Sequence, residues 1–186
     1  MSPKDENELQ HMLYTALRLA RPVALRYPRG NGSGVPLDEQ LAELPLGKAE
    51  VLRHGAHVGL LAYGPLVQTA LAAAEVLSAQ GVEATVVNLR FAKPLDEALR
   101  VDLAMRLPLL VTMEENALQG GVGSAILETL ESHRPVNARI RRLGIPDAYV
   151  EHGNAEILRR KCDLAVQGVL EVVARELPEL RRQPEP

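Results

Sequence analysis

The spacing of apolar positions along the chain changes near residue 48. Before this point, residues 2–20 predict a helix, because Ser2 and Pro3 suit a helix start and apolar side chains recur at helical intervals. The side chains that share one face of this helix are Leu9, Met12, Leu13, Ala16, Leu17 and Ala20. Pro22 should end the helix, and the Val-, Ala- and Leu-rich residues 22–27 predict a short strand.

Beyond residue 48, short apolar runs alternate with amphipathic stretches. The predicted strands are 48–53, 58–63, 84–89, 109–113 and 136–143, and the predicted helices are 66–77, 96–105, 122–131 and 154–177. The run 58–63 is apolar without interruption, which is typical of a strand buried on both faces. The alternation predicts an α/β fold with a mostly parallel sheet, helices on both faces, and 48–53 at an edge.

A loop rich in glycine and proline separates these two parts. Residues 28–47 cannot hold regular structure, so they mark the best domain boundary. One helix and one strand cannot bury their own apolar faces, and residues 1–30 should therefore pack against a neighbour. The last helix should break near Cys162, and the charged residues 181–186 should form a loose tail.

Composition narrows the function classes. Of 186 residues, 46% are hydrophobic and 24% charged, which suits a globular core, and the net charge is -3. Lys and Arg are interleaved with acids, so we expect no nucleic-acid groove. A single cysteine excludes an intramolecular disulfide framework and fits a cytoplasmic protein. No apolar stretch reaches the roughly 20 residues that a membrane span needs.

The first candidate for chemistry is the segment Arg26-Tyr-Pro-Arg29-Gly-Asn-Gly32. A strand end feeds a glycine-rich loop there, and ligands of parallel sheets gather at such ends. The planar guanidinium of arginine suits phosphate, and glycines let the backbone approach an anion. From spacing alone, a surface arginine beside a linker is the favoured interpretation.

The second candidate is Glu114-Glu115-Asn116, followed by the glycine-rich turn 120–123 and Ser124 before a helix. Backbone N–H groups at that helix start could cradle an anion, and the two carboxylates could act in acid–base chemistry or contact a partner subunit. A tight turn beside a solvated acidic pair is the favoured interpretation.

The remaining polar motifs favour structural interpretations. Asp147 and His152 could pair, yet no serine or cysteine nucleophile is spaced to use them. His54 and His57 flank a glycine in a probable turn without an acidic third ligand, so we expect no metal site. Cys162 lies in a helical region as a small apolar residue.

Several of these segments together resemble one enzyme family, the 1-deoxy-D-xylulose-5-phosphate synthases. The segments that carry the resemblance are Ser2-Pro-Lys-Asp-Glu-Asn-Glu-Leu9, Arg26-Tyr-Pro-Arg-Gly-Asn31, Leu46-Gly-Lys48, Asn88-Leu-Arg-Phe-Ala-Lys-Pro-Leu-Asp96, Glu114-Glu-Asn-Ala117, Gly120-Gly-Val-Gly-Ser124 and Leu143-Gly-Ile-Pro-Asp147. They run in one unbroken order over about residues 1–175. Generic transketolase-like chains share the layout but match these segments less closely.

The resemblance implies a homodimeric enzyme that uses thiamine diphosphate and Mg2+ to condense pyruvate, after decarboxylation, with glyceraldehyde 3-phosphate. It implies that residues 1–35 end a pyrimidine-binding domain, 36–47 link, and 48–180 form a transketolase-like C-terminal domain. Arg29 matches the arginine that binds the phosphate of the acceptor substrate. The catalytic, cofactor and metal ligands are expected outside this chain, so the chain alone should be inactive.

Two other function classes stay open. The chain could be a non-catalytic interaction or subunit-assembly module that docks through residues 1–30 and the region of Gly120, with no cofactor in the complex. It could also be a regulatory domain that binds a small ligand or nucleotide at the Gly120 loop. Both rank below the enzyme portion, because the resemblance covers most of the chain.

Overall fold

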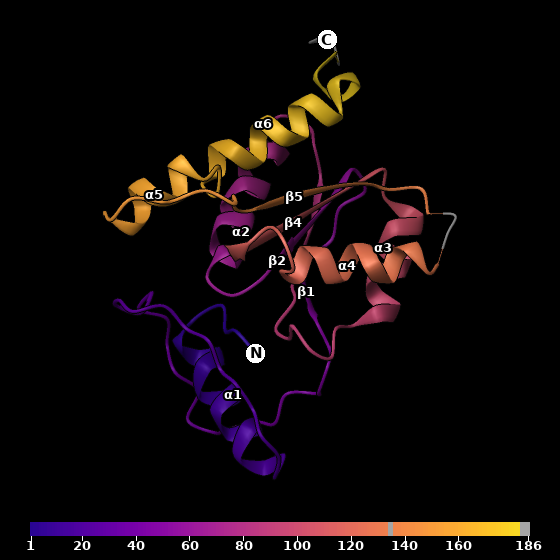
Figure 1. The fold of residues 1–186 in the computed structure, drawn as a ribbon. Coiled ribbons are helices and arrows are strands. Elements are labelled where there is room, and N and C mark those ends of the chain that lie inside the picture. Colours follow the sequence, from indigo (N-terminus) through magenta and orange to yellow (C-terminus); the bar gives the residue numbers. More distant parts are fainter. Residues whose placement is uncertain (134–135, 183–186) are drawn as a thin grey trace.

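The computed structural model describes residues 1–133 and 136–182 and contains one five-stranded sheet in the order β1-β3-β2-β4-β5 (Figure 1). The strands are β1 (Glu50–Arg53), β2 (Val58–Ala62), β3 (Ala84–Asn88), β4 (Leu109–Ala117) and β5 (Arg139–Ile145). Strands β2 to β5 pair in parallel, and β1 is antiparallel to β3 at one edge. All residues of β2 are buried, as the uninterrupted apolar run indicated.

Helices cover both faces of the sheet (Figure 1). On one face, α2 (Leu66–Ser78) and α6 (Val166–Glu176) pack on a core that includes Leu60 and Val111. On the other face, α3 (Glu97–Arg106) and α4 (Val122–Glu131) pack on a second core that includes Leu61 and Leu110. Alternate residues of one strand thus serve opposite cores, and the predicted α/β fold is confirmed.

The last helical region is divided as the sequence predicted. Helix α5 (Ala155–Lys161) ends at Cys162, and α6 begins four residues later after Ala165. A 3-10 helix, Pro178–Arg182, follows, so the first two residues of the expected loose tail belong to a helical turn. Residues 183–186 of that tail lie outside the described residues.

The N-terminal segment differs in two ways from the prediction. Helix α1 spans Glu6–Arg18, and the carboxylate of Asp5, not Ser2, caps it by accepting the backbone N–H of Glu8 at 2.7 Å. Ser2 lies buried beside the sheet, where its backbone N–H donates to the carbonyl of Arg90. The chain reaches the sheet four residues before its helix begins, which takes Ser2 away from the helix end.

Residues 22–27 do not form the predicted strand. Their backbone groups bond to residue 1: the Met1 amino group donates to the carbonyl of Ala24 at 2.8 Å, and the N–H of Arg26 donates to the carbonyl of Met1 at 2.9 Å. A strand needs a ladder of such bonds along a neighbouring strand, and β-propensity does not supply it. The segment is therefore no strand of the sheet.

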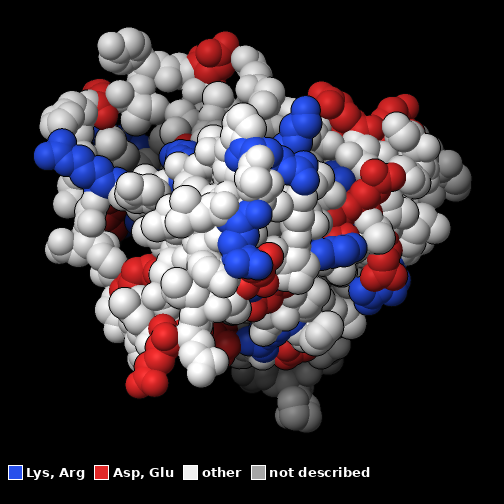
Figure 2. Space-filling view, turned by 90° about the horizontal axis from the view of Figure 1, so that it is seen from below, with Lys and Arg blue, Asp and Glu red and all other residues white. Residues whose placement is uncertain are grey.

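The surface carries mixed charge. On the face seen from below, acidic and basic side chains are interspersed without a large patch of one sign (Figure 2). Within residues 1–133 and 136–182, no helix has the length and apolar character that crossing a bilayer demands.

Candidate functional site

Arg29 lies at a hollow of about 440 Å3 between the start of α1 and the loop that follows residue 26. The hollow is also lined by Lys4, Tyr27 and Asn31. Arg29 is exposed, so its guanidinium is available to an anion in solution. The structure thus brings the glycine-rich loop of the first candidate motif against the first turn of a helix.

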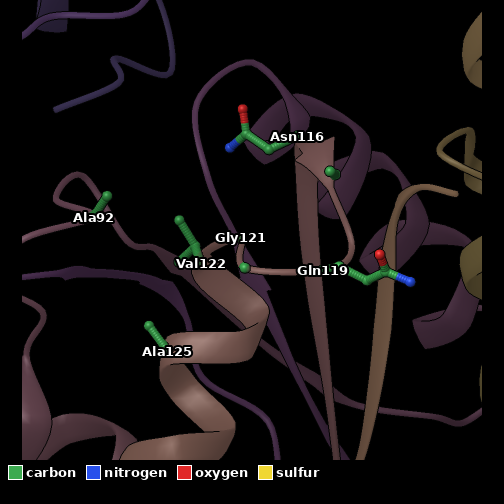
Figure 3. A pocket seen from close by; sticks show the side chains of 8 residues that line it. Ala92, Asn116, Gln119, Gly121, Val122 and Ala125 are labelled. Carbon is green, nitrogen blue, oxygen red and sulfur yellow. The ribbon is translucent and has the colours of Figure 1, made fainter. Parts of the chain in front are cut away.

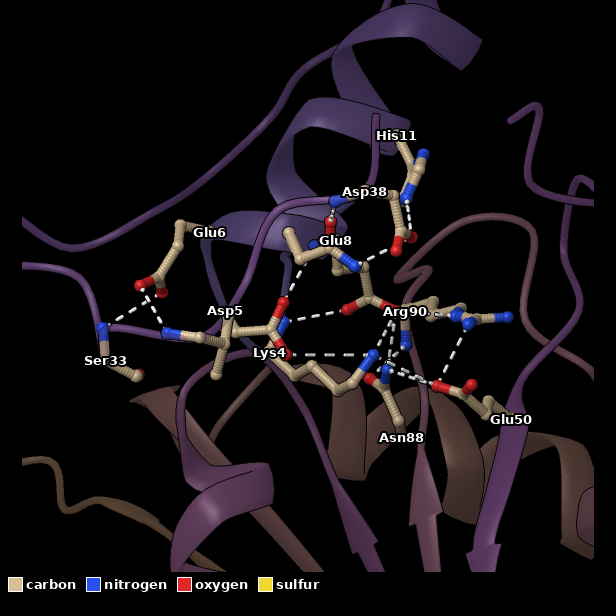
Figure 4. A network of polar contacts seen from close by, with 12 residues as sticks. Lys4, Asp5, Glu6, Glu8, His11, Ser33, Asp38, Glu50, Asn88 and Arg90 are labelled. Atoms are coloured by element: carbon tan, nitrogen blue, oxygen red, sulfur yellow. Dashed lines mark hydrogen bonds and ion pairs between the residues drawn. The ribbon is translucent and has the colours of Figure 1, made fainter. Parts of the chain in front are cut away.

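The loop beyond Arg29 is held by one carboxylate of that helix. Glu6 accepts three consecutive backbone N–H groups: Ser33 at 2.9 Å, Gly34 at 2.5 Å and Val35 at 3.1 Å (Figure 4). Its own backbone N–H and those of the loop favour the charged form and lower the pKa of Glu6 below its ordinary value. The sequence pattern gave no signal for this role of Glu6.

Polar side chains one helical turn apart on α1 hold the rest of the same loop. The Asn7 amide oxygen accepts the N–H of Asp38 at 2.8 Å, and the Asp38 carboxylate lies 2.9 Å from Nε2 of His11. Nδ1 of His11 accepts the N–H of Ala42 at 3.1 Å. Asn7 and His11 are four residues apart and therefore lie on one face of α1, and this face binds the loop.

A buried polar network fastens α1 to the sheet (Figure 4). Oε1 of Glu8, which is 2% exposed, accepts Nδ2 of Asn88 and Nε of Arg90, each at 2.7 Å. Oε2 of Glu50 on β1 lies 2.9 Å from Nη2 of Arg90 and 3.3 Å from Nζ of Lys4. Both carboxylates therefore have cationic partners, which the buried charge of Glu8 requires.

Arg26 and Glu115 come together, which the spacing did not reveal. Nη2 of Arg26 donates to the backbone carbonyl of Glu115 at 2.9 Å. The Glu115 carboxylate accepts Nε of Arg159 on α5 at 2.5 Å. These residues and Cys162 line a hollow of about 220 Å3. Arg26 thus has a structural role that joins the N-terminal segment to the end of β4.

Glu114 occupies the position where the sequence suggested an anion site. Its carboxylate is 1% exposed and accepts the first backbone N–H groups of α4, Val122 at 2.7 Å and Gly123 at 2.8 Å. The expectation of a solvated acidic pair is therefore wrong for Glu114. The glycine turn leaves a hollow of about 350 Å3 beside Asn116 (Figure 3), but its anion-binding amides are already used. This arrangement weighs against a nucleotide site at the Gly120 loop.

The remaining polar residues singled out in the sequence do not come together into a site. Asp147 and His152 are exposed, and the structure gives no hydrogen bond between them in its described part. Nδ1 of His57 accepts the N–H of Glu83 at 2.8 Å, which fixes a turn. Cys162 is a half-buried free thiol. Across the described ranges, 1–133 and 136–182, no three His, Cys, Asp or Glu side chains are placed to hold a metal ion.

The family model for the transketolase C-terminal domain matches residues 47–169. The chain belongs to this family. This transketolase C-terminal domain is also similar to 1-deoxy-D-xylulose-5-phosphate synthases: 51% identity to that of Heliobacterium modesticaldum over 98% of the chain, and 49% to that of Desulforudis audaxviator over 91%. It spans 28% and 27% of those proteins, corresponding to their C-terminal part.

Solved structures agree with the transketolase assignment. The domain superposes on a split-gene transketolase described as an inactive β4 tetramer, with TM-score 0.83, 31% identity, and coverage of 97% of this chain and 58% of that one. The transketolase of Campylobacter jejuni, at TM-score 0.52 and 19% identity over 69% of this chain and 18% of that one, shares the fold. The transketolase-like fold expected from the resemblance is thereby confirmed.

Proposed function

We propose that the chain is the C-terminal portion of a 1-deoxy-D-xylulose-5-phosphate synthase. The enzyme would condense pyruvate, with loss of CO2, and glyceraldehyde 3-phosphate, and it would work as a cytoplasmic homodimer. The observation that carries this proposal is identity of 48–52% to synthases over 91–99% of the chain. Because the chain spans little more than a quarter of those relatives, the activity requires the rest of the enzyme.

The chain divides, in this proposal, as the sequence predicted. Residues 1–35 would complete a pyrimidine-binding domain, 36–47 would link, and 48–180 would form the C-terminal domain. The family match over residues 47–169 supports a C-terminal domain that begins near residue 48. The exposed Leu13 and Leu17 on α1, at 53% and 75%, would be covered by the remainder of the pyrimidine-binding domain.

The residues described here do not fit thiamine diphosphate and its Mg2+. Glu114 fills the amide cradle at α4 with negative charge, and among residues 1–133 and 136–182 no metal-binding cluster of carboxylates or histidines exists. The cofactor and metal ligands would therefore lie in other parts of the enzyme. No catalytic step is assigned to this chain.

Arg29 is the substrate contact that we propose for this chain. A guanidinium can form two parallel charge-assisted hydrogen bonds to a phosphate, and the exposed Arg29 lies beside a hollow that admits one. Binding the remote phosphate would orient the aldehyde carbon of glyceraldehyde 3-phosphate for attack. The role of Arg29 would be to bind and orient the substrate, without proton transfer.

The substitution Arg29→Ala in the complete enzyme tests this role. Loss of charge-assisted bonds to phosphate should lower kcat/KM for glyceraldehyde 3-phosphate about 10- to 100-fold. Use of unphosphorylated glyceraldehyde should be unchanged. Arg21→Ala is the matched control, because Arg21 is also exposed and lies outside the hollow. Equal kinetics of the Arg29 variant and wild type with both acceptors would remove Arg29 from the site.

A second function is favoured by one observation. The split-gene transketolase that this chain resembles is described as an inactive β4 tetramer, so a chain of this fold can assemble without activity. The alternative is a non-catalytic subunit-assembly module. Native mass and denatured mass measured on one sample with thiamine diphosphate and Mg2+ distinguish the two. A longer chain that retains cofactor supports the synthase, whereas a cofactor-free assembly of this chain supports the module.

A further inference from the structure

We propose that Glu6 is a positioning residue that holds the Arg29 loop in its phosphate-binding conformation. This inference rests on the proposed role of Arg29. Glu6 lies in the first turn of α1, and its carboxylate accepts the N–H groups of Ser33, Gly34 and Val35. The two loop residues nearest to Arg29 in this cluster are thus four and five positions beyond it.

The loop is built around this carboxylate. A Cβ added at Gly32 would lie 2.7 Å from Oε1 of Glu6 and 2.8 Å from its Cδ, so the backbone approaches the carboxyl group as closely as glycine permits. Gly34 donates its N–H to the same oxygen and has a φ of +79°, a backbone conformation that favours glycine. Gly32 and Gly34 are therefore both adapted to one acid on another element.

A carboxylate suits this task better than an amide. Three N–H donors converge on two oxygens, and an ionised carboxylate can accept all of them. A glutamine would present its NH2 group to at least one of these donors. The N–H groups would then lose partners, and the loop would lose the contact that orders it.

The helix that carries Glu6 is itself fixed to the sheet. Glu6 lies two residues before Glu8, whose carboxylate accepts hydrogen bonds from Asn88 and Arg90 beside the sheet. Glu8 thus joins α1 to the sheet and Glu6 joins α1 to the loop, so a short series of contacts, each with a charged side chain, connects the loop to the sheet. A loop with Gly30, Gly32 and Gly34 is costly to order, and a preformed anchor lowers the cost of binding substrate phosphate.

The test is Glu6→Gln in the complete enzyme, with Glu39→Gln as the matched control on an exposed glutamate of the same loop. The Glu6 variant should have a KM for glyceraldehyde 3-phosphate about tenfold higher than that of the wild type. Its kcat, and its kinetics with unphosphorylated glyceraldehyde, should stay within about twofold of wild type. The control should match wild type with both acceptors. An equal loss with both acceptors, or no loss, would overturn the proposal.

Amide hydrogen exchange supplies the second measurement. Residues 33–35 should exchange faster in the Glu6 variant, while the amides of β4 keep wild-type rates. If Glu6→Gln fails to fold, Gly32→Ala should give the same selective rise in KM, because its methyl group would displace the carboxylate. Wild-type KM and exchange in that variant would also overturn the proposal.

Arg29→Ala measured in parallel separates two failures. If Arg29→Ala impairs only the use of the phosphorylated acceptor and Glu6→Gln does not, the positioning role of Glu6 is wrong and the proposed function is retained. No effect of Arg29→Ala in an active enzyme sinks the proposed phosphate site itself.

Discussion

The cap that Glu114 forms on α4 yields a prediction whose size follows from the structure. Two backbone N–H groups, those of Val122 and Gly123, donate to this one buried carboxylate at 2.7 and 2.8 Å. In Glu114→Gln, a single carbonyl oxygen remains, and the NH2 group faces the second donor. A buried N–H without a partner costs about 1–3 kcal/mol, and the lost charge at a helix N-terminus costs about 1 kcal/mol. We expect a loss of about 2–4 kcal/mol in the free energy of unfolding.

Urea unfolding followed by circular dichroism measures this loss. The matched control is Glu128→Gln on the exposed face of the same helix, which should change the free energy of unfolding by less than about 0.5 kcal/mol. If Glu114→Gln unfolds with the same free energy as the Glu128 variant, the carboxylate does not stabilise the helix start, and the reasoning is wrong.

Two further predictions concern pH and packing. Burial raises the pKa of Glu50, but the charges of Arg90 and Lys4 outweigh this effect and hold the pKa below 4.5. The stability that this group contributes is therefore present above pH 4.5 and is lost as the pH falls through the lowered pKa. Glu50→Gln should flatten the acid limb of a stability–pH curve measured by urea unfolding, and an unchanged limb would contradict this. Ile126→Ala, at a fully buried position, should cost about 2–5 kcal/mol in the same assay, whereas Leu127→Ala, 37% exposed, should cost less than about 1 kcal/mol; equal costs would refute the burial argument.

The sequence predicted the sheet well because its strands are set by burial. The run 58–63 has no polar residue, and only a strand between two helical layers can bury it on both faces. The edge strand and the break at Cys162 were likewise predicted. Residues 22–27 are also rich in Val, Ala and Leu, but they have no neighbouring strand to pair with, and composition alone cannot supply one.

The candidate site was predicted in part. Arg29 was singled out by its loop and by the resemblance, and the structure shows it exposed beside a hollow, while its phosphate role stays a prediction. Glu6 was not assigned a role, and Glu114 was expected in a solvated acidic pair, because each acts on amides that only the fold brings near. The signal for Glu114 was present as an acid at a buried strand end eight residues before a Gly-Val-Gly helix start.

Product formation by the complete protein tests the central proposal most directly. With thiamine diphosphate and Mg2+, pyruvate and glyceraldehyde 3-phosphate should yield 1-deoxy-D-xylulose 5-phosphate and CO2 in equal amounts, since one three-carbon acid loses CO2 and joins a three-carbon aldehyde. Mass spectrometry of the sugar phosphate and trapping of CO2 from labelled pyruvate measure both products. Equal amounts of the two are the predicted result. An intact, cofactor-loaded protein that releases neither would contradict the assignment to a synthase.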